Sequence, residues 1–192
     1  MEGTPCSKRR CFEIDLFFRK VILLVPLSVF IIGSYGYPCL AEPENKERRL
    51  KFFNTHTDEG VDVIYKRGEA FLPGALREID YILRDHRSGE IHPIDPVLLD
   101  FLYDLLTELD YYGEVHIISG YRSPKTNQKL HERSSGVAKG SMHIHGKAID
   151  FRLPGVDTAI IRKTALAMKR GGVGYYKKLD FVQIDTGRVR SW

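Results

Sequence analysis

The order of helical and extended patterns over residues 49–192 is the feature that most limits the fold of this chain. Helix-like and strand-like segments follow one another without a regular strand–helix–strand alternation and without an internal repeat. A mixture of this kind favours the α+β class. We therefore expect a single domain with a mainly antiparallel sheet flanked by helices.

Periodicity and local start signals place the elements along the chain. Asp95-Pro96 and Ser123-Pro124 each combine an N-cap residue with a first-turn proline, which is typical of a helix start. Together with apolar residues at helical spacing, they predict helices over 72–85, from 96 to near 113, over 124–132 and over 157–170. Alternating or short apolar runs predict a hairpin over 50–65 and strands at 115–119, 148–153, 171–176 and 181–185.

Residues 1–41 have the pattern of an export signal. Basic residues precede an uncharged apolar run over 21–33, which is shorter than the roughly 18–20 residues of a membrane-spanning helix. Cys39 and Ala41 occupy the two positions that a signal peptidase reads, so cleavage after Ala41 is expected. The pair Arg9-Arg10 leaves twin-arginine export open beside the general route. An uncleaved anchor helix is the remaining alternative, and only this leader would then contact a membrane.

Length, charge and cysteine usage limit the rest of the chain. The 192 residues allow one domain of about 150 residues and a tail, which we place as a linker over 42–48 and a domain over 49–192. A net charge of +4, from 29 basic and 25 acidic residues, is too small to indicate nucleic-acid binding. All three cysteines lie in the leader, so a cleaved chain without thiols would suit the oxidising periplasm.

Potential metal ligands are densest between Ser141 and Asp150. Zinc binds imidazole and carboxylate together, and His143 and Asp150 can converge if the chain turns at Gly146. A His and an Asp at this spacing are also common in surface loops, so the spacing alone leaves both interpretations open. We expect the other histidines, which are scattered along the chain, to be structural or exposed residues. A serine hydrolase is disfavoured because the sequence has no Gly-x-Ser-x-Gly motif.

Longer motifs resemble the M15 metallopeptidases, a group that includes D-Ala-D-Ala carboxypeptidases and dipeptidases. The signature residues are Ser141, His143, Gly146, Ala148 and Asp150. The segments 54–57, 83–87, 118–124, 136–139, 171–176 and 185–190 extend the resemblance to the murein endopeptidase K branch. The similarity covers roughly residues 49–192. It implies the fold of the D-Ala-D-Ala metallopeptidases (hedgehog/DD-peptidase-like) and an exported zinc peptidase that cuts peptide cross-links of peptidoglycan.

The resemblance also implies roles for single residues. His143 and Asp150 match two Zn²⁺ ligands, Arg122 matches a residue that binds substrate or steadies the oxyanion, and Ser141 matches a position at the mouth of the site. Asp180 occupies the position of the general base. Tyr121 is a candidate for the substrate groove, although a packing role is equally compatible with it.

Position 183 departs from the family pattern. The third ligand should be a histidine in a Phe-Val-His-x-Asp context, and this chain has Gln183 there. An amide oxygen is a weaker zinc donor than an imidazole nitrogen. Gln183 could ligate weakly, His145 or Asp185 could substitute, or the chain could be a catalytically weakened or inactive protein that binds the cell wall. The peptide bond expected from the resemblance is a D-amino-acid bond, such as D-Ala to meso-diaminopimelate.

Overall fold

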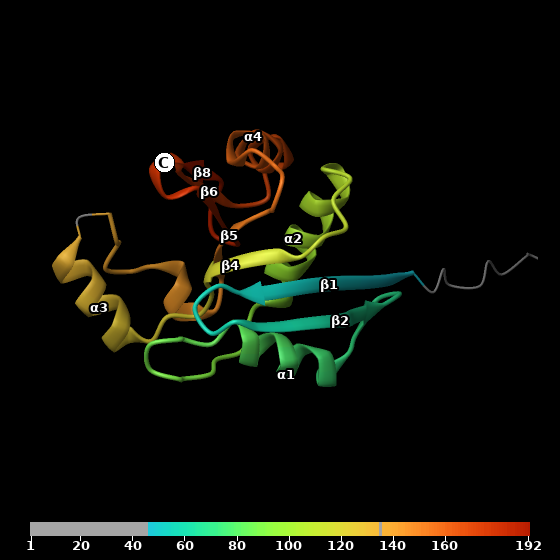
Figure 1. Cartoon of the computed structure of the whole chain (residues 1–192), viewed down its shortest axis with the longest axis horizontal. Helices are drawn as coiled ribbons and strands as arrows, with labels where there is room; N and C mark the ends of the chain where they lie inside the picture. Colours follow the sequence, from blue (N-terminus) through green and yellow to red (C-terminus); the bar gives the residue numbers. More distant parts are fainter. Residues whose placement is uncertain (1–45, 135) are drawn as a thin grey trace, which may run out of the picture. The chain divides into compact units, whose positions relative to one another are not determined.

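The computed structural model describes residues 46–134 and 136–192. Within these residues, a single eight-stranded sheet is combined with four α-helices and two short 3-10 helices. The helices are α1 Pro73–Ile82, α2 Pro96–Glu108, α3 Pro124–Arg133 and α4 Thr158–Met168, with η1 Met142–His145 and η2 Lys177–Leu179. The strands are β1 Glu47–Asn54, β2 Glu59–Arg67, β3 Ala70–Phe71, β4 Val115–Ser119, β5 Ala148–Arg152, β6 Gly172–Tyr176, β7 Phe181–Asp185 and β8 Arg190–Ser191. Figure 1 shows α1 beside the β1–β2 hairpin, α4 at the opposite end of the sheet and α3 projecting from the body.

The sheet has the order β3-β2-β1-β4-β5-β7-β6-β8. Its pairs are antiparallel except β1–β4 and β6–β8, which are parallel. The expected α+β domain with a mainly antiparallel sheet is therefore confirmed. Strands and helices lie along the chain between the two members of each parallel pair, because a strand can return in the same direction only after a longer connection.

The predicted elements agree with the structure except at a few points. β1 begins at Glu47, so its first two residues belong to the sheet and not to the expected linker over 42–48. Strands β3 and β8 follow no sequence signal, because two residues are too few to display an alternating pattern. The sequence predicted 181–185 as the last strand, whereas the sheet continues with β8. The expected leader, 1–41, lies outside the described residues.

The two faces of the sheet have different roles. Ile117, Phe151 and Val182 are neighbours across β4, β5 and β7, and all three lie in the core. The leucine-rich face of α2 packs into the same core, where Leu98, Leu102 and Leu105 are fully buried. Since successive strand residues point to opposite faces, Asp150 and Gln183 point away from this core. The candidate functional residues of β5 and β7 thus occupy the opposite face.

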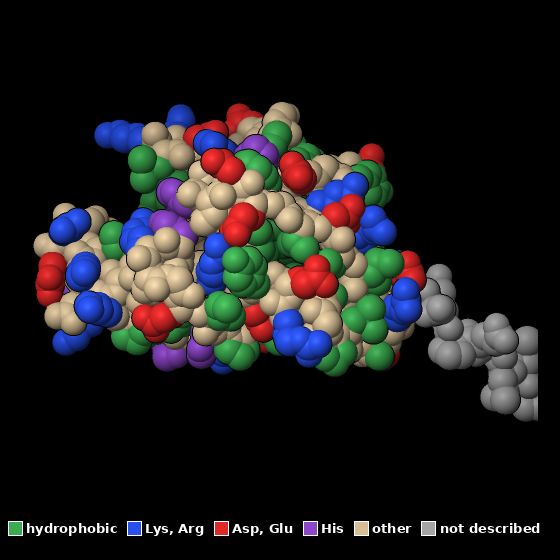
Figure 2. All heavy atoms as spheres, turned by 60° about the horizontal axis from the view of Figure 1, so that its bottom comes forward, with side chains coloured by type: hydrophobic (Ala, Val, Ile, Leu, Met, Phe, Trp, Pro, Cys, Tyr) green, Lys and Arg blue, Asp and Glu red, His purple; other side chains and the backbone are tan. Residues whose placement is uncertain are grey.

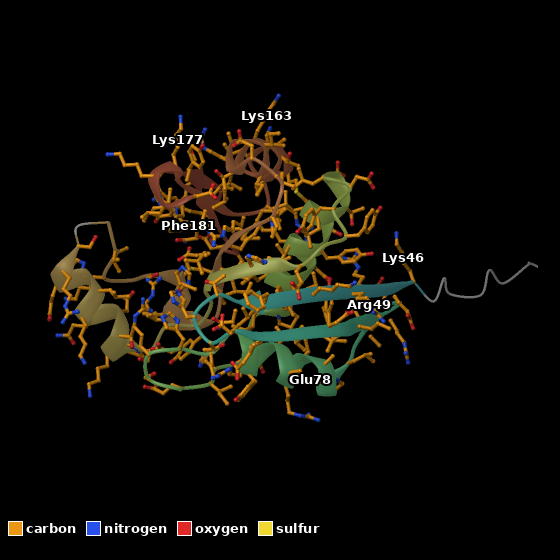
Figure 3. The ribbon with its side chains drawn as sticks, in the orientation of Figure 1. Lys46, Arg49, Glu78, Lys163, Lys177 and Phe181 are labelled. Carbon is orange, nitrogen blue, oxygen red and sulfur yellow. The ribbon has the colours of Figure 1, made fainter. Side chains whose placement is uncertain are left out.

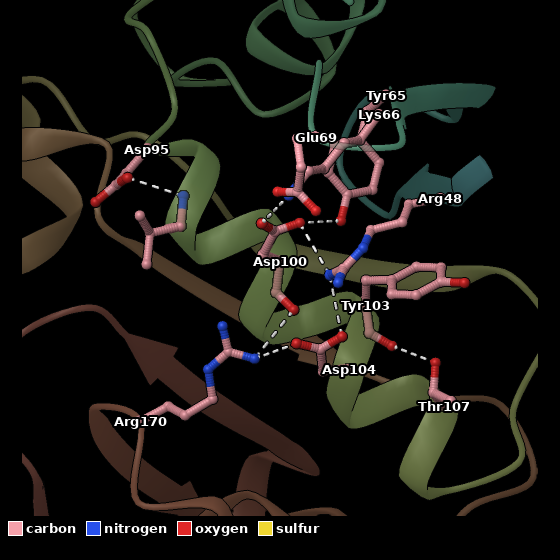
Figure 4. A network of polar contacts seen from close by, with 11 residues as sticks. Arg48, Tyr65, Lys66, Glu69, Asp95, Asp100, Tyr103, Asp104, Thr107 and Arg170 are labelled. Carbon is pink, nitrogen blue, oxygen red and sulfur yellow. Dashed lines mark hydrogen bonds and ion pairs between the residues drawn. The ribbon is translucent and has the colours of Figure 1, made fainter. Parts of the chain in front are cut away.

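A network of charged side chains fixes α2 to its neighbours (Figure 4). Asp100 accepts hydrogen bonds from Arg48 at 3.0 Å, Lys66 at 3.1 Å and the Tyr65 hydroxyl at 2.8 Å. Asp104 accepts a hydrogen bond from Arg48 at 3.0 Å and forms an ion pair with Arg170, which follows α4. Burial and the neighbouring Asp100 carboxylate raise the pKa of Tyr65 well above its usual range. The network joins β1, β2, α2 and the end of α4.

The surface of the described residues mixes both signs of charge. In Figure 2, basic and acidic side chains are interspersed over the visible face, with several basic groups at the end that carries α3. No helix within the described ranges has the length and apolar character needed to cross a membrane.

Candidate metal centre and substrate cleft

His143 is presented by the short turn η1. The Ser141 hydroxyl caps this turn by accepting the His143 amide at 3.4 Å, and Gly146 ends it with a φ of 63°. The turn lies so close to the loop before α2 that a Cβ at residue 146 would sit 2.2 Å from the Pro93 carbonyl oxygen. Only glycine satisfies both the left-handed backbone and this close approach. The local sequence thus explains why the chain returns to place Asp150 beside His143.

The imidazole of His143 is held between a carbonyl and a carboxylate. Its Nδ1 lies 2.6 Å from the Gly120 carbonyl oxygen, and its Nε2 lies 3.2 Å from Oδ1 of Asp150. A carbonyl oxygen can only accept, so Nδ1 must carry the proton. In a neutral ring the lone pair of Nε2 then faces an anionic oxygen, an arrangement that a cation between the two atoms would stabilise. Ligands about 2.0–2.1 Å from a tetrahedral zinc lie about 3.3 Å apart, so the observed spacing fits that ion.

Gln183 is the third polar side chain at this point. It pairs directly with Asp150 across β5 and β7, and with Gly174 across β7 and β6. Side chains opposite each other on neighbouring strands lie on the same face, so its amide lies beside the His143–Asp150 pair. Within the described residues, no three His, Cys, Asp or Glu side chains converge. The donor set is therefore one imidazole, one carboxylate and one amide, which fits zinc with two strong donors and one weak donor.

Arg122 borders the same centre. Its Nη2 lies 3.5 Å from Oδ2 of Asp150 and 3.3 Å from the Ser119 hydroxyl, and its Nη1 donates to Asn127 at 3.3 Å. Burial lowers the pKa of this guanidinium, while Asp150 opposes the shift. Its Nε atom is buried and has no hydrogen-bond partner among the residues that the structure describes. The guanidinium is consequently a desolvated cation with donor capacity left over.

A second carboxylate stabilises the segment that carries Arg122. Asp85 is almost fully buried and accepts the backbone amides of Ser123 at 3.0 Å and of Arg87 at 2.9 Å. Hydrogen bonds from Thr126 and Ser123 hold the pKa of Asp85 well below its usual range, against the effect of its burial. This contact fixes the start of α3 directly after Arg122.

Part of this centre lines one cleft of about 560 Å³, whereas His143 itself is not among the lining residues. Arg122, Ser141, Asp150 and Gln183 line it, as expected from the sequence, together with residues of the 136–142 segment and of β6, η2, β7 and β8. Among the described lining residues, Asp150 is the single acidic side chain.

Asp180 lies elsewhere, in contrast to the role expected for it. It ends η2 with a φ of 53°, and its Oδ1 accepts the hydroxyl of Thr158 at 3.2 Å at the start of α4. It lines a separate hollow with His116 and Arg152. The left-handed turn directs the carboxylate to α4, so the expectation that Asp180 is a general base in the cleft is not supported.

Three other candidates are also outside the cleft lining. Tyr121 is 7% exposed and stacks on His92 with ring centroids 4.7 Å apart, which makes it a packing residue. His145 is exposed at the end of η1. Asp185 is fully buried and pairs with Arg190 at 2.7 Å. Neither His145 nor Asp185 replaces a histidine at position 183.

Sequence reasoning missed several contributors to the centre. The Gly120 carbonyl is a backbone group, which no motif reveals. Asn127 donates to the carbonyls of Ala138 and Lys139, both at 3.1 Å, and so connects α3 to the cleft rim. The only sequence signal for Asn127 was its position in the first helical turn after Ser123-Pro124. Trp192 lies far along the chain and has no spacing relation to the ligands.

An α+β domain with a buried His–Asp pair, of which Asp150 lines a cleft, is the arrangement that the resemblance to M15 metallopeptidases implies. The chain belongs to the peptidase M15 family described as peptidoglycan L,D-endopeptidase MepK, whose sequence model matches residues 42–192. It is 41% identical to the peptidoglycan L,D-endopeptidase MepK of Escherichia coli strain K12, over 94% of this chain and 99% of that protein. A probable peptidoglycan L,D-endopeptidase MepK of Haemophilus influenzae is also 41% identical, over 93% and 97%. No solved structure matches the chain significantly.

Proposed function

We propose that this protein is a zinc-dependent peptidase that cleaves peptide cross-links of peptidoglycan. The observation that carries the proposal is the His143–Asp150 pair, in which a protonated Nδ1 leaves Nε2 and the carboxylate directed at one point. Family membership supports the same activity, since the matching relatives are named peptidoglycan endopeptidases. These names favour a working enzyme over the inactive wall-binding alternative.

The bond proposed here differs from the one that the resemblance first suggested. The relatives are named L,D-endopeptidases, whereas D-Ala to meso-diaminopimelate joins two D-centres. We therefore propose that the scissile bond joins an L-configured centre of one peptide stem to a D-configured centre of another. The substrate remains the peptide part of peptidoglycan.

In this proposal His143, Asp150 and the amide oxygen of Gln183 hold Zn²⁺. Bound zinc would lower the pKa of a water ligand and polarise the peptide carbonyl. The Gly120 carbonyl keeps the proton on Nδ1 and so keeps Nε2 available for the metal. Arg122 would donate to the carbonyl oxygen as negative charge develops on it, a contribution often of a few kcal/mol. Asp180 has no part in the proposed reaction.

The fold and the location complete the proposal. We infer that the sheet and its helices correspond to the D-Ala-D-Ala metallopeptidase fold, a proposal supported by membership in the M15 family. A substrate in the cell wall requires the protein to act outside the cytoplasm. The leader that would export it, by the twin-arginine or the general route, lies outside the described residues.

Digestion of purified muropeptides tests the proposed function. Dimers whose cross-link joins an L-configured centre to a D-configured centre are incubated with the protein plus zinc, with the protein plus chelator, and with an Asp150→Asn variant plus zinc. We expect cleavage in the first reaction alone, and mass spectrometry of the products identifies the bond. Intact dimers in the presence of zinc, with the protein shown to be folded, would refute the hydrolase assignment and favour the wall-binding alternative.

A further inference from the structure

The cleft has a second wall whose chemistry the metal centre does not explain. Tyr176, Leu179, Phe181 and Trp192 line one side of it, and we call these four residues the apolar wall. Arg122, Asp150 and Gln183 form the polar side. Phe181 lies toward the middle of the molecule in Figure 3, while Lys177, four residues earlier, lies at its outer edge. The chain thus turns its apolar residues toward the cleft and its lysine outward.

Two members of this wall are exposed although they are large and apolar. Leu179 is 65% exposed and Trp192 is 45% exposed. Apolar side chains that are exposed together inside a concave site are typical of ligand-binding surfaces. Ile160 on α4 is exposed to a similar extent, at 53%, but does not line the cleft.

The indole of Trp192 is fixed in place despite its exposure. Its Nε1 donates to the Tyr176 hydroxyl at 3.0 Å, and the Arg190 guanidinium lies 4.7 Å from its ring centroid. The backbone amide and carbonyl of Trp192 bond to Val173 and Tyr175 at 3.3 Å and 3.1 Å. Tyr176 is itself stacked on Phe181 with centroids 4.4 Å apart. A rigid aromatic surface of this kind binds a ligand with little loss of conformational entropy.

The wall also lies next to the proposed ligands. The Trp192 ring covers Gly174, where a Cβ would come within 2.7 Å of the indole. Gly174 pairs directly with Gln183 on β7, and Gln183 pairs with Asp150 on β5. The indole is therefore one strand away from the amide that completes the metal centre. A substrate held at that centre would extend over the apolar wall.

We propose that the apolar wall binds the aliphatic part of the stem-peptide residue adjacent to the scissile bond, with Leu179 and Trp192 as its contact residues. This inference rests on the proposed function, because it places the substrate at the His143–Asp150 centre. The same cleft supplies both surfaces, so the occupant is a peptidoglycan peptide and not a separate partner. The contact would contribute to substrate binding and not to the chemical step.

The chain carries its own reporter for this contact, since Trp192 is its one tryptophan. Cross-linked muropeptide dimers are titrated into the protein with chelator present, so that nothing is cleaved, while tryptophan emission is recorded. We expect a saturable change of emission. Leu179→Ala should weaken this binding about fivefold, because it removes contact area alone. In the cleavage assay with zinc, the same variant should raise KM about fivefold and leave kcat unchanged. Ile160→Ala is the matched control and should leave both values unchanged.

The outcomes separate this inference from the proposed function. The apolar wall is excluded if calorimetry detects muropeptide binding while tryptophan emission stays constant. It is also excluded if Leu179→Ala and Ile160→Ala behave alike in a protein that binds and cleaves. If the unaltered protein neither binds nor cleaves muropeptides, the proposed function itself fails, and this inference fails with it.

Discussion

In the proposed metal centre, the side chain at residue 183 would determine how firmly the ion is held. His143 and Asp150 provide one nitrogen and one anionic oxygen at 3.2 Å, but Gln183 adds only a neutral amide. Its backbone position on β7, directly opposite Asp150, is the position from which an imidazole would reach the same point. The strand geometry is thus suited to a third strong ligand that the sequence does not provide.

Gln183→His should therefore tighten zinc binding. We expect the dissociation constant to fall at least about tenfold, since even the loss of outer-shell partners of a zinc site costs about 10–100-fold. Turnover of muropeptides should rise with it. Competition with a chromophoric chelator measures the affinity. Gln128→His, which adds an imidazole on the exposed face of α3, is the control. Equal affinities for all three proteins would mean that residue 183 is not a ligand.

The sequence revealed the candidate ligand side chains but not their surroundings. His143 and Asp150 could be identified because both carry ligand groups and Gly146 between them permits a turn. The Gly120 carbonyl could not be identified, because every residue has such a group and only the fold decides which one meets Nδ1. The position of the Asp180 side chain could not be predicted for a related reason. Its place three residues before position 183 says how far it lies along the chain but not where its side chain points. The left-handed turn at Asp180 directs its carboxylate to Thr158.

At the level of elements, the turn η1 depends on Gly146 for both conformation and space. Gly146→Ala adds left-handed strain and a contact with the Pro93 carbonyl, so we expect a loss of about 3 kcal/mol in the free energy of unfolding. Gly155 also has a positive φ, of 82°, but no atom of residues 46–134 or 136–192 lies within 4 Å of its Cβ position. Gly155→Ala should cost only about 1 kcal/mol. Urea unfolding compares the two, and equal losses would argue against the steric contact.

The charged network on α2 provides a second prediction at this level. Asp100→Asn removes the charge that Arg48 and Lys66 share in a partly buried setting, so we expect a loss of about 2–3 kcal/mol. Asp62 pairs with Arg49 at 3.1 Å on the exposed surface, and Asp62→Asn should cost less than about 1 kcal/mol. Chemical denaturation of both variants measures the difference. A cost for Asp100→Asn no larger than that for Asp62→Asn would show that the network does not stabilise α2.

For the molecule as a whole, the arrangement of layers divides stability from function. The leucines of α2 pack against the core face of the sheet. Asp150, Gln183 and the apolar wall lie on the opposite face. The α+β class and most strands could be predicted, because their periodicity is local. The parallel pairing of β1 with β4 joins segments some 60 residues apart, and no local pattern encodes such a pairing.

Acid should weaken the whole domain through the loop that precedes α2. The His86 ring stacks on His56 with centroids 4.0 Å apart, and burial together with the nearby Arg87 and His56 lowers its pKa to about 4. The unfolded chain, with an ordinary pKa near 6.5, therefore binds this proton first. The contribution of neutral His86 is complete above about pH 6.5 and is lost as the pH falls toward 4.

The size of this effect can be measured by denaturation across that pH range. We expect a fall of about 1 kcal/mol in the free energy of unfolding, allowing for solvent screening at a half-exposed ring. His86→Gln should flatten the profile between pH 6.5 and 4, because it removes the titrating group. Gln128→Ala, a change without a titrating group on the exposed side of α3, should leave the slope unchanged. Asp85, the residue before His86, anchors Ser123 next to Arg122, so weakening of this loop would reach the cleft. If His86→Gln retains the full slope, another group carries the acid sensitivity.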